Sequence, residues 1–127
     1  MSDDRPDPIR PPVTAAAIAA QVRQSLDMAD LDTLGALLSP DVRWGPPGSA
    51  RPPCRNRDQV LAWYAKGREQ GRRATVTEVE VHHNALLVGL RLEDGHERWQ
   101  VMRVGPDGIN EITGFDDRPG ASRQLGS

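Results

Sequence analysis

The sequence has little of what disulfide bonding, metal binding or membrane insertion would need. Cys54 is the single cysteine in 127 residues, so no disulfide can form within the chain and no second thiol is present to share a metal ion. No apolar run approaches the roughly 20 residues that span a bilayer. The first residues are acidic and rich in proline, unlike the basic and then apolar order of a signal peptide. We therefore expect a cytoplasmic protein.

An excess of charge of one sign is also lacking. Acidic and basic residues nearly balance, with a formal net charge of -2, so a nucleic-acid partner has no electrostatic support. Arg68, Arg72 and Arg73 stand at the end of a predicted helix, where cations complement the helix dipole. We expect neither a nucleic-acid nor a membrane partner.

Cys54 stands in a loop, between Pro53 and Arg55. Neighbouring arginines can lower the pKa of a thiol, but a nucleophile also needs a positioned base. The adjacent sequence supplies no such base. We interpret Cys54 as a loop thiol without a catalytic role.

Composition divides the chain into three parts. Residues 1–12 carry four prolines and three aspartates and almost no apolar side chains, which predicts a disordered arm. Residues 118–127 are similarly poor in anchoring side chains and are predicted to form a flexible tail. A single domain over 13–117 remains, long enough to bury one core.

Three helices are expected in the first part of that domain. Thr14 and Asp30 are suited to cap the first two, Ser39-Pro40 stops the second, and Asn56 opens the third. The side chains at helical spacing that we expect to face the core are Ala15, Ile18, Ala19, Val22 and Leu26, then Leu31, Leu34, Leu37 and Leu38, then Val60, Leu61 and Tyr64.

The second half of the domain alternates with the period of strands. Strands are expected over 42–44, 75–82, 86–93, 98–104 and 109–116. Glycine-containing turn signals at 93–96 and 106–108 separate the last three strands. Helices followed by consecutive strands predict an α+β fold, with three N-terminal helices covering one face of a curved, mostly antiparallel sheet.

Four landmarks together resemble the nuclear transport factor two-like superfamily, in particular its SnoaL-like members. They are LLSPDVRW at 37–44, RDQVLAWY at 57–64, WQVMRV at 99–104 and PDGINEITGFDD at 106–117. The resemblance implies a ketosteroid isomerase-like, cystatin-like fold: a cone-shaped half-barrel closed by helices. It also implies a pocket at the wide end and a homodimer through the sheet face. This superfamily includes enzymes and non-enzymes, so the fold does not decide the function.

Ketosteroid isomerases need a carboxylate base and an oxyanion hole made of a tyrosine and a protonated acid. The resemblance places Pro46, Val22 and Gln100 at these positions. None of the three can remove a proton, and only Gln100 can donate a hydrogen bond. That reaction is therefore not expected.

The resemblance to SnoaL-like cyclases implies a simpler catalytic scheme, in which an aspartate on the last strand acts as general acid and base. Asp116 is the matching residue. Buried in an apolar pocket, its carboxyl would have a raised pKa suited to proton transfer. At a solvated strand end it would form a salt bridge instead. Arg91 or Arg98 with Asp116 resembles part of an epoxide-hydrolase site, whose second inward aspartate is missing.

His82 and His83 are adjacent, so they point to opposite faces of a strand and one of them could reach the pocket. Their place at a strand end, before Asn84, favours exposure of both. No cysteine or carboxylate stands at ligand spacing, so we expect no metal site and no cofactor.

The three tryptophans supply most of the aromatic surface. Trp44 and Trp63 either line a cavity for a flat apolar ligand or pack in the core. Trp99 alternates with Gln100, which assigns it to the sheet's outer face and the dimer contact. The residues predicted to line the pocket are Trp44, Trp63, Tyr64, Gln100, Met102, Ile112 and Gly114.

The leading hypothesis is a dimeric SnoaL-like protein whose pocket binds a small, largely apolar organic molecule, without a complete catalytic set. Two alternatives stay open. One is a cyclase, isomerase or hydrolase of secondary-metabolite type that uses Asp116 as acid and base and Gln100 as polar anchor. The other is a non-catalytic dimeric association module whose pocket is filled by side chains.

Overall fold

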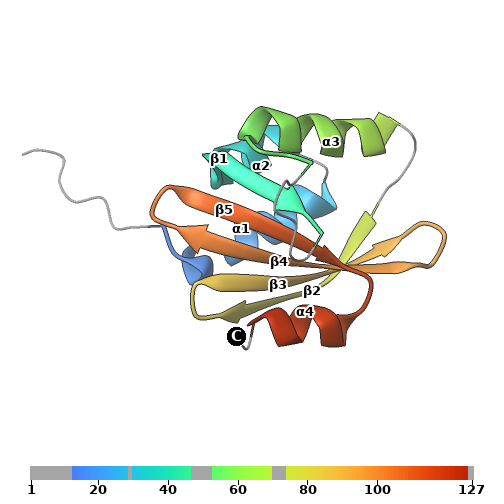
Figure 1. Cartoon of the computed structure of the whole chain (residues 1–127). Helices are drawn as coiled ribbons and strands as arrows, with labels where there is room; N and C mark the ends of the chain where they lie inside the picture. The colour runs from blue at the N-terminus through green and yellow to red at the C-terminus, as the bar shows by residue number, and fades with distance from the viewer. Residues whose placement is uncertain (1–12, 29, 47–52, 70–73, 126–127) are drawn as a thin grey trace, which may run out of the picture.

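The computed structural model describes residues 13–28, 30–46, 53–69 and 74–125. The arm predicted over 1–12 lies outside these residues. Within the described part, the fold is α+β, with four helices on a five-stranded mixed sheet (Figure 1). None of the described helices is long and apolar enough to cross a membrane.

The elements follow the predicted order, with one helix more than expected. The helices are α1 (Ala15–Asp27), α2 (Leu31–Leu37), α3 (Arg57–Glu69) and α4 (Arg118–Leu125). The strands are β1 (Leu38–Gly45), β2 (Ala74–His82), β3 (Ala85–Leu92), β4 (Glu97–Gly105) and β5 (Gly108–Phe115). Strand β1 begins earlier than predicted, so Leu38 belongs to the sheet and not to the second helix.

The strands are ordered β1-β5-β4-β3-β2. Strands β2 to β5 form an antiparallel meander, and β1 pairs parallel with β5, so that Leu38 lies opposite Ile109 and Trp44 opposite Ile112. Both predicted glycine turns are present. Gly95 and Gly108 adopt positive φ angles there, of 90° and 124°.

The helix starts are those that the capping residues predicted. The Thr14 hydroxyl accepts from the Ala17 N–H at 3.2 Å, and the Asp30 carboxylate accepts from the Thr33 N–H at 3.1 Å. The Asn56 side chain accepts from the N–H of Gln59 in the same way, at 2.9 Å. Each cap satisfies a backbone donor that the first turn of a helix leaves free, which is why local sequence predicted these starts.

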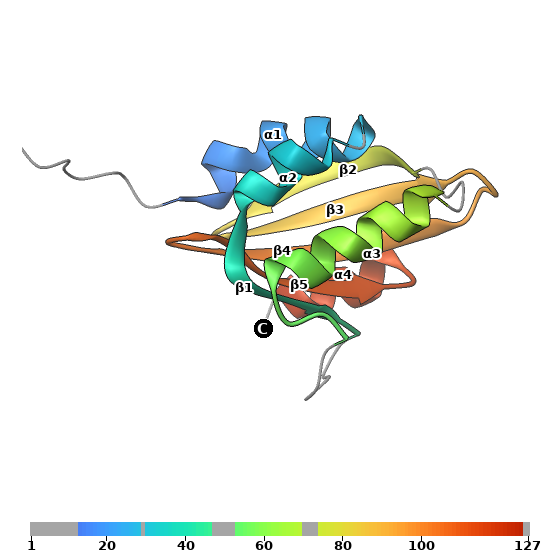
Figure 2. The same ribbon diagram turned by 90° about the horizontal axis from the view of Figure 1, so that it is seen from above.

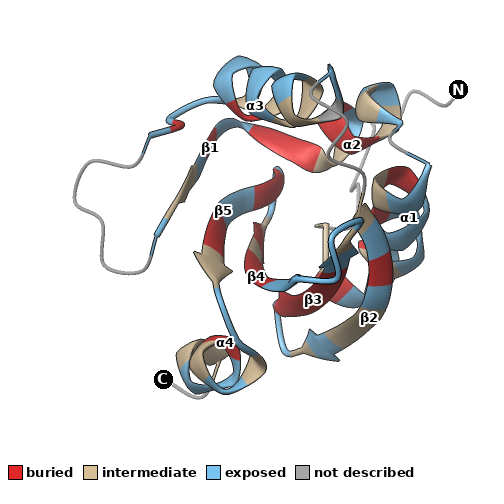
Figure 3. Cartoon of the chain, turned by 90° about the vertical axis from the view of Figure 1, so that its right-hand side faces the viewer, coloured by how far each residue is buried: buried red, intermediate tan, exposed pale blue. Residues whose placement is uncertain are grey.

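Helices cover both faces of the sheet (Figure 2). We call the face under α1 and α3 the inner face and the face under α4 the outer face (Figure 3). The main core lies on the inner face, where Val88, Met102 and Ile112 are fully buried against the helices. A smaller cluster on the outer face joins Leu87 and Val101 to α4.

The prediction of a flexible tail was wrong for residues 118–125, which form α4. Ala121 is fully buried against the outer face, and Leu125 packs at its edge. The backbone carbonyl of Gln124 accepts a hydrogen bond from Arg103 of β4 at 3.1 Å. The helix was missed because it is short and presents only two apolar side chains to the sheet, too few for a recognisable helical stripe.

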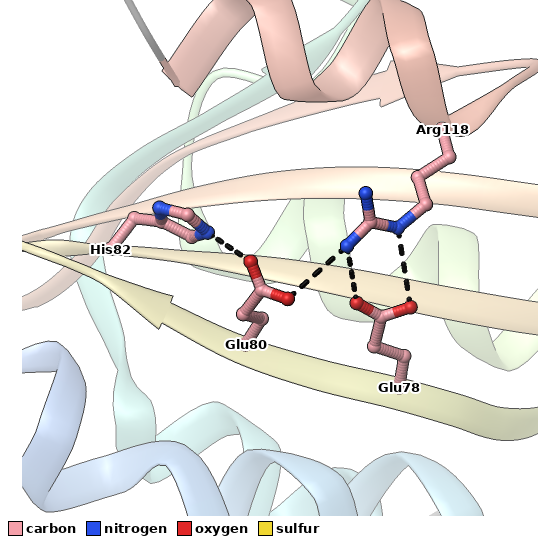
Figure 4. Close-up of polar contacts among 4 residues, drawn as sticks. All are labelled: Glu78, Glu80, His82 and Arg118. Atoms are coloured by element: carbon pink, nitrogen blue, oxygen red, sulfur yellow. Dashed lines mark hydrogen bonds and ion pairs between the residues drawn. The ribbon is translucent and has the colours of Figure 1, made fainter.

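Arg118, at the start of α4, joins the helix to β2 (Figure 4). Its guanidinium donates to both carboxylate oxygens of Glu78, at 2.7 and 3.3 Å, and to Glu80 at 3.1 Å. The other oxygen of Glu80 contacts the His82 ring. Arg118 also lies 5.7 Å from the centre of the Trp99 ring. The two carboxylates and the ring together hold α4 on the outer face.

The ion pair between Arg118 and Glu78 predicts a pH-dependent contribution to stability. Hydrogen bonding from Arg118 lowers the pKa of the Glu78 carboxyl from its ordinary value of 4.5. A carboxyl whose pKa is lower in the folded protein stabilises the fold above its unfolded pKa, and the contribution is lost as pH falls through the folded value. Arg118→Gln should therefore lower the thermal midpoint slightly at neutral pH, and the difference from the wild type should vanish well below pH 4.5.

Thermal unfolding of both proteins across the acidic range measures this difference. Arg91→Gln is the control, because Arg91 pairs with an exposed carboxylate, that of Glu97, at 3.7 Å. Such a pair contributes little at any pH. A difference between Arg118→Gln and the wild type that stays constant down to low pH would contradict the role assigned to this pair.

Candidate functional site

The candidate site is an aromatic cluster where α3 lies over β1 and the inner face. Trp44 comes from β1, and Trp63 and Tyr64 come from α3. The ring of Tyr64 stacks on that of Trp44, with centroids 6.1 Å apart, and Trp63 meets both rings edge-on. Trp63 is 44% exposed, so it forms the outer wall of the cluster and not its interior.

The register of three neighbouring strands brings the predicted pocket residues together. In β4 and β5, Gln100 lies opposite Gly114 and Met102 opposite Ile112. Ile112 in turn lies opposite Trp44 of β1. Side chains two apart share a face, so all five positions lie on the inner face. Met102 and Ile112 are fully buried and belong to the core beneath the cluster.

Tyr64 and Gln100 form the polar pair of the site. The Tyr64 hydroxyl donates to the Gln100 side-chain oxygen at 3.3 Å. Gln100 itself is buried. Burial raises the pKa of Tyr64 to about 12, so the phenol stays protonated at neutral pH. The pair therefore supplies neutral hydrogen-bonding groups and no base.

The indole nitrogen of Trp44 is buried without a hydrogen-bond partner, and it is the one such side-chain atom in the described part of the chain. It lies beside Gly114. A Cβ placed on Gly114 would meet no atom within 4 Å except this nitrogen, at 4.0 Å. Such a Cβ would be in ordinary van der Waals contact with the indole nitrogen.

Cys54 lies at the edge of the site, which sequence reasoning missed. Its backbone pairs with that of Trp44 in an isolated bridge, with N–O distances of 3.0 and 3.2 Å. The thiol is buried and lies 3.7 Å from the Gln59 carbonyl. Burial raises the pKa of this thiol, the reverse of activation by flanking arginines. No local signal predicts the bridge, because it joins two segments across a loop.

Asp116 does not have the environment that a general acid and base requires. Its side chain is 89% exposed and forms an ion pair with Arg98 at the end of the sheet. The acid–base role required burial in an apolar pocket, and the carboxylate is not buried. Of the two outcomes foreseen for Asp116, the structure has the solvated salt bridge.

The histidines also lie away from the site. His82 points to the outer face, where it contacts Glu80, and His83 is exposed in the turn after β2 with a φ of 51°. Val22 is fully buried in α1, and its side chain has no hydroxyl to donate. Pro46, directly after β1, is exposed. Within the described residues, no group of three histidine, cysteine or acidic side chains could hold a metal ion.

Trp99 lies on the outer face, as its alternation with Gln100 predicted, but it is not exposed there. It packs against Ala121 of α4 and is only 8% exposed. Its ring covers Gly89, where a Cβ would come within 2.7 Å of the indole. Helix α4 therefore occupies the place at which we expected Trp99 to contact a second subunit.

Comparison with known proteins shows the fold. The sequence matches no protein-family model and no curated protein. A SnoaL-like protein of unknown function from Burkholderia thailandensis E264 has a similar structure, with a TM-score of 0.65, 16% identity, and coverage of 85% of this chain and 100% of that one.

Two further solved structures carry names that suggest enzymes. One, from Sinorhizobium meliloti, is provisionally described as a polyketide cyclase (TM-score 0.63, 14% identity, 78% of this chain and 94% of that one). The other, from Kribbella flavida DSM 17836, is provisionally described as a ketosteroid isomerase (TM-score 0.63, 20% identity, 80% and 76%). At such identities the likeness concerns the fold. The chain has the fold shared by SnoaL-like, NTF2-like and cystatin-fold proteins, as the four sequence landmarks predicted.

Proposed function

We propose that this protein binds a small, flat, largely apolar organic molecule on the inner face, between α3 and the strands β1, β5 and β4. The observation that carries the proposal is the indole N–H of Trp44, which is buried beside Gly114 and has no partner among the described residues. Buried polar groups are nearly always paired, so an unpaired one favours a partner from outside the described residues.

The composition of the site supports the same function. Trp44, Tyr64 and Trp63 offer ring faces and edges, and Gln100 offers one amide. Binding sites for small organic molecules are mostly apolar and aromatic, with a few polar groups that orient the ligand. The aromatic groups would contact the flat body of the ligand, and the polar groups would orient it.

Binding without catalysis is the better-supported form of this function. The described site residues include no carboxylate or histidine, and the Tyr64 phenol stays protonated. Acid–base catalysis needs a group that exchanges a proton near neutral pH. A cyclase, isomerase or hydrolase that uses Asp116 gains no support from that residue's exposure.

The cone-shaped half-barrel and the homodimer remain predictions. The curl of the sheet seen end-on supports the cone, with its concave side toward α1, α2 and α3 (Figure 3). Because α4 covers part of the outer face, a dimer through the sheet has to include α4 or the exposed side of β2. Light scattering on the purified protein tests this association, and a monomer at all concentrations would remove it.

Filling the space over Gly114 should abolish binding. Gly114→Val places two methyl groups beside the Trp44 indole, where a Cβ meets nothing closer than 4.0 Å. We expect stability to be kept or slightly raised, because valine favours strands more than glycine does. We expect binding of flat two- and three-ring compounds to be lost. Thermal shift with a panel of such compounds measures both effects.

Thr113→Val is the matched control, since it adds a valine to the same strand on the opposite face. It should leave the ligand-induced rise in the midpoint unchanged. No rise with any compound in the wild type would instead favour an association module. An equal rise in Gly114→Val would place the ligand elsewhere.

A further inference from the structure

Helix α4 covers an apolar part of the outer face but is itself held by few apolar contacts. The side chains beneath it include Leu87, Val101 and Trp99, which lie on the neighbouring strands β3 and β4. Ala121 is the one buried residue among the eight of α4, whereas α1 buries four. An isolated helix of this length is not stable in water. The helical state of α4 therefore depends on its attachment to the sheet.

Three carboxylates accept hydrogen bonds from the first turn of α4. Arg118 donates to Glu78 at 2.7 and 3.3 Å and to Glu80 at 3.1 Å (Figure 4). The carboxylate of Asp117 caps the helix, because it accepts from the backbone N–H of Gly120 at 2.7 Å. Hydrogen bonds to a charged acceptor are stronger than those between neutral groups. The charged state of these three acids therefore favours the docked helix.

The other titratable side chains around α4 do not replace these bonds in acid. They are His82 of β2, Arg103 of β4, Glu111 of β5 and Arg123 of the helix itself. Arg103 donates to the carbonyl of Gln124 at 3.1 Å and pairs with Glu111 at 3.5 Å. An arginine stays charged in acid, so this attachment at the end of α4 persists. His82 contacts Glu80, so when protonated it binds the same carboxylate as Arg118 and does not hold the helix. The side chains that β3 packs under α4 are apolar.

The link between β5 and α4 allows the helix to leave without disturbing the strand. Strand β5 ends at Phe115, and Asp116 and Asp117 join it to the helix. Asp116 is 89% exposed, and its ion pair is with Arg98 of β4. Segments with few buried contacts open at a lower free energy than the core. Opening of α4 can therefore precede unfolding of the sheet.

We propose that α4 is an acid-released cover of the outer face, which leaves the sheet as a unit when Glu78, Glu80 and Asp117 lose their charge. A carboxylate that accepts these bonds only while α4 is docked binds its proton more weakly in the docked state. Docking is therefore favoured at neutral pH and weakens as pH falls. For Glu78, the bonds from Arg118 lower the pKa from its ordinary value of 4.5, so the loss occurs below that value. Release exposes the apolar side chains beneath α4, while the core on the inner face stays packed.

Hydrogen exchange at neutral pH and at about pH 3 tests the proposal. Protection factors are compared in place of raw rates, because the intrinsic exchange rate itself depends on pH. In acid, the protection of the hydrogen-bonded amides of α4 should fall about tenfold more than that of the amides of β3 and β4.

The double variant Glu78→Gln, Glu80→Gln tests the role of the carboxylates, since it keeps the size of both side chains and removes their charge. Its α4 amides should already be about fivefold less protected than those of the wild type at neutral pH. The further fall in acid should be smaller than in the wild type. Glu97→Gln is the matched control, because it removes an exposed carboxylate that pairs with Arg91. It should behave as the wild type.

The outcomes distinguish release of α4 from unfolding of the whole domain. Equal losses of protection in α4 and in the central strands would show that the helix unfolds with the rest, and the proposal fails. Unchanged protection of α4 in acid contradicts it as well. Wild-type protection of α4 in the double variant at neutral pH would show that these carboxylates do not hold the helix. An equal effect of Glu97→Gln would assign the change to the overall charge of the protein and would also overturn the proposal.

Discussion

Replacing Gly108 with alanine is expected to lower the free energy of unfolding by about 3 to 4 kcal/mol. Gly108 has a φ of 124°, in a region that residues with a side chain rarely adopt. A Cβ at this position would lie 2.5 Å from the carbonyl oxygen of Leu37 and 3.2 Å from the nitrogen of Ser39. Both contacts are with backbone, which cannot rotate away. The turn between β4 and β5 would therefore separate from the junction of α2 and β1.

Gly95→Ala is the matched control for this experiment. Gly95 also has a positive φ, of 90°, but a Cβ there would meet no atom within 4 Å. We expect it to cost about 1 kcal/mol, from backbone strain alone. Denaturant unfolding of the two variants separates strain from collision. Equal losses in both would show that Gly108 is not held against the α2–β1 junction.

The effect of Gly108→Ala should be large because this contact starts the parallel pairing of β1 with β5. Leu38 lies opposite Ile109, one residue beyond Gly108, and both are fully buried. That pairing carries Trp44 to its place opposite Ile112. A variant that still folds should therefore also bind flat aromatic compounds more weakly, which the thermal-shift panel measures.

Trp99→Ala is expected to lower the free energy of unfolding by about 3 to 5 kcal/mol, the cost of deleting a large buried side chain. The indole fills the space between Gly89 and α4 and supports Arg118. Its loss removes a large part of the surface on which Ala121 packs, so α4 should become the first element to unfold. Denaturant unfolding gives the free energy, and hydrogen exchange follows the amides of α4.

Trp63→Ala is the matched comparison, because it makes the same substitution at a tryptophan that is partly exposed. Trp63 is 44% exposed on α3, so the same truncation should cost less than about 1 kcal/mol. The loss in Trp99→Ala should also be independent of protein concentration, since the burial lies within one chain. A loss that grows on dilution would instead support the dimer contact first expected for Trp99.

Much of the fold was predictable because local interactions specify it. The caps at Thr14, Asp30 and Asn56 act within one helical turn, and the glycine turns act between adjacent residues. Alternation along 98–104 correctly put Gln100 and Met102 on one face and Trp99 on the other. Helix α4 escaped prediction, since its stability comes from docking on the outer face and not from its own sequence pattern.

The strand faces that make up the candidate site were predictable from the sequence, and the surroundings of its side chains were not. Gln100, Met102, Ile112 and Gly114 share a face because they alternate along two paired strands. Whether a side chain on such a strand is buried depends on how far the neighbouring elements extend. Asp116 stands just beyond β5, where none of the described helices covers it, and so it is exposed and paired with Arg98.

By itself, the sequence determined the order of helices and strands, their caps and turns, and the faces of the last strands, since these depend on residues near one another in the chain. Only the tertiary structure decided that β1 runs parallel to β5 and that α4 covers part of the outer face. It also decided that Trp44 holds a buried, unpaired N–H over Gly114. These features depend on contacts between distant segments, whose geometry is set by the packing of the whole domain.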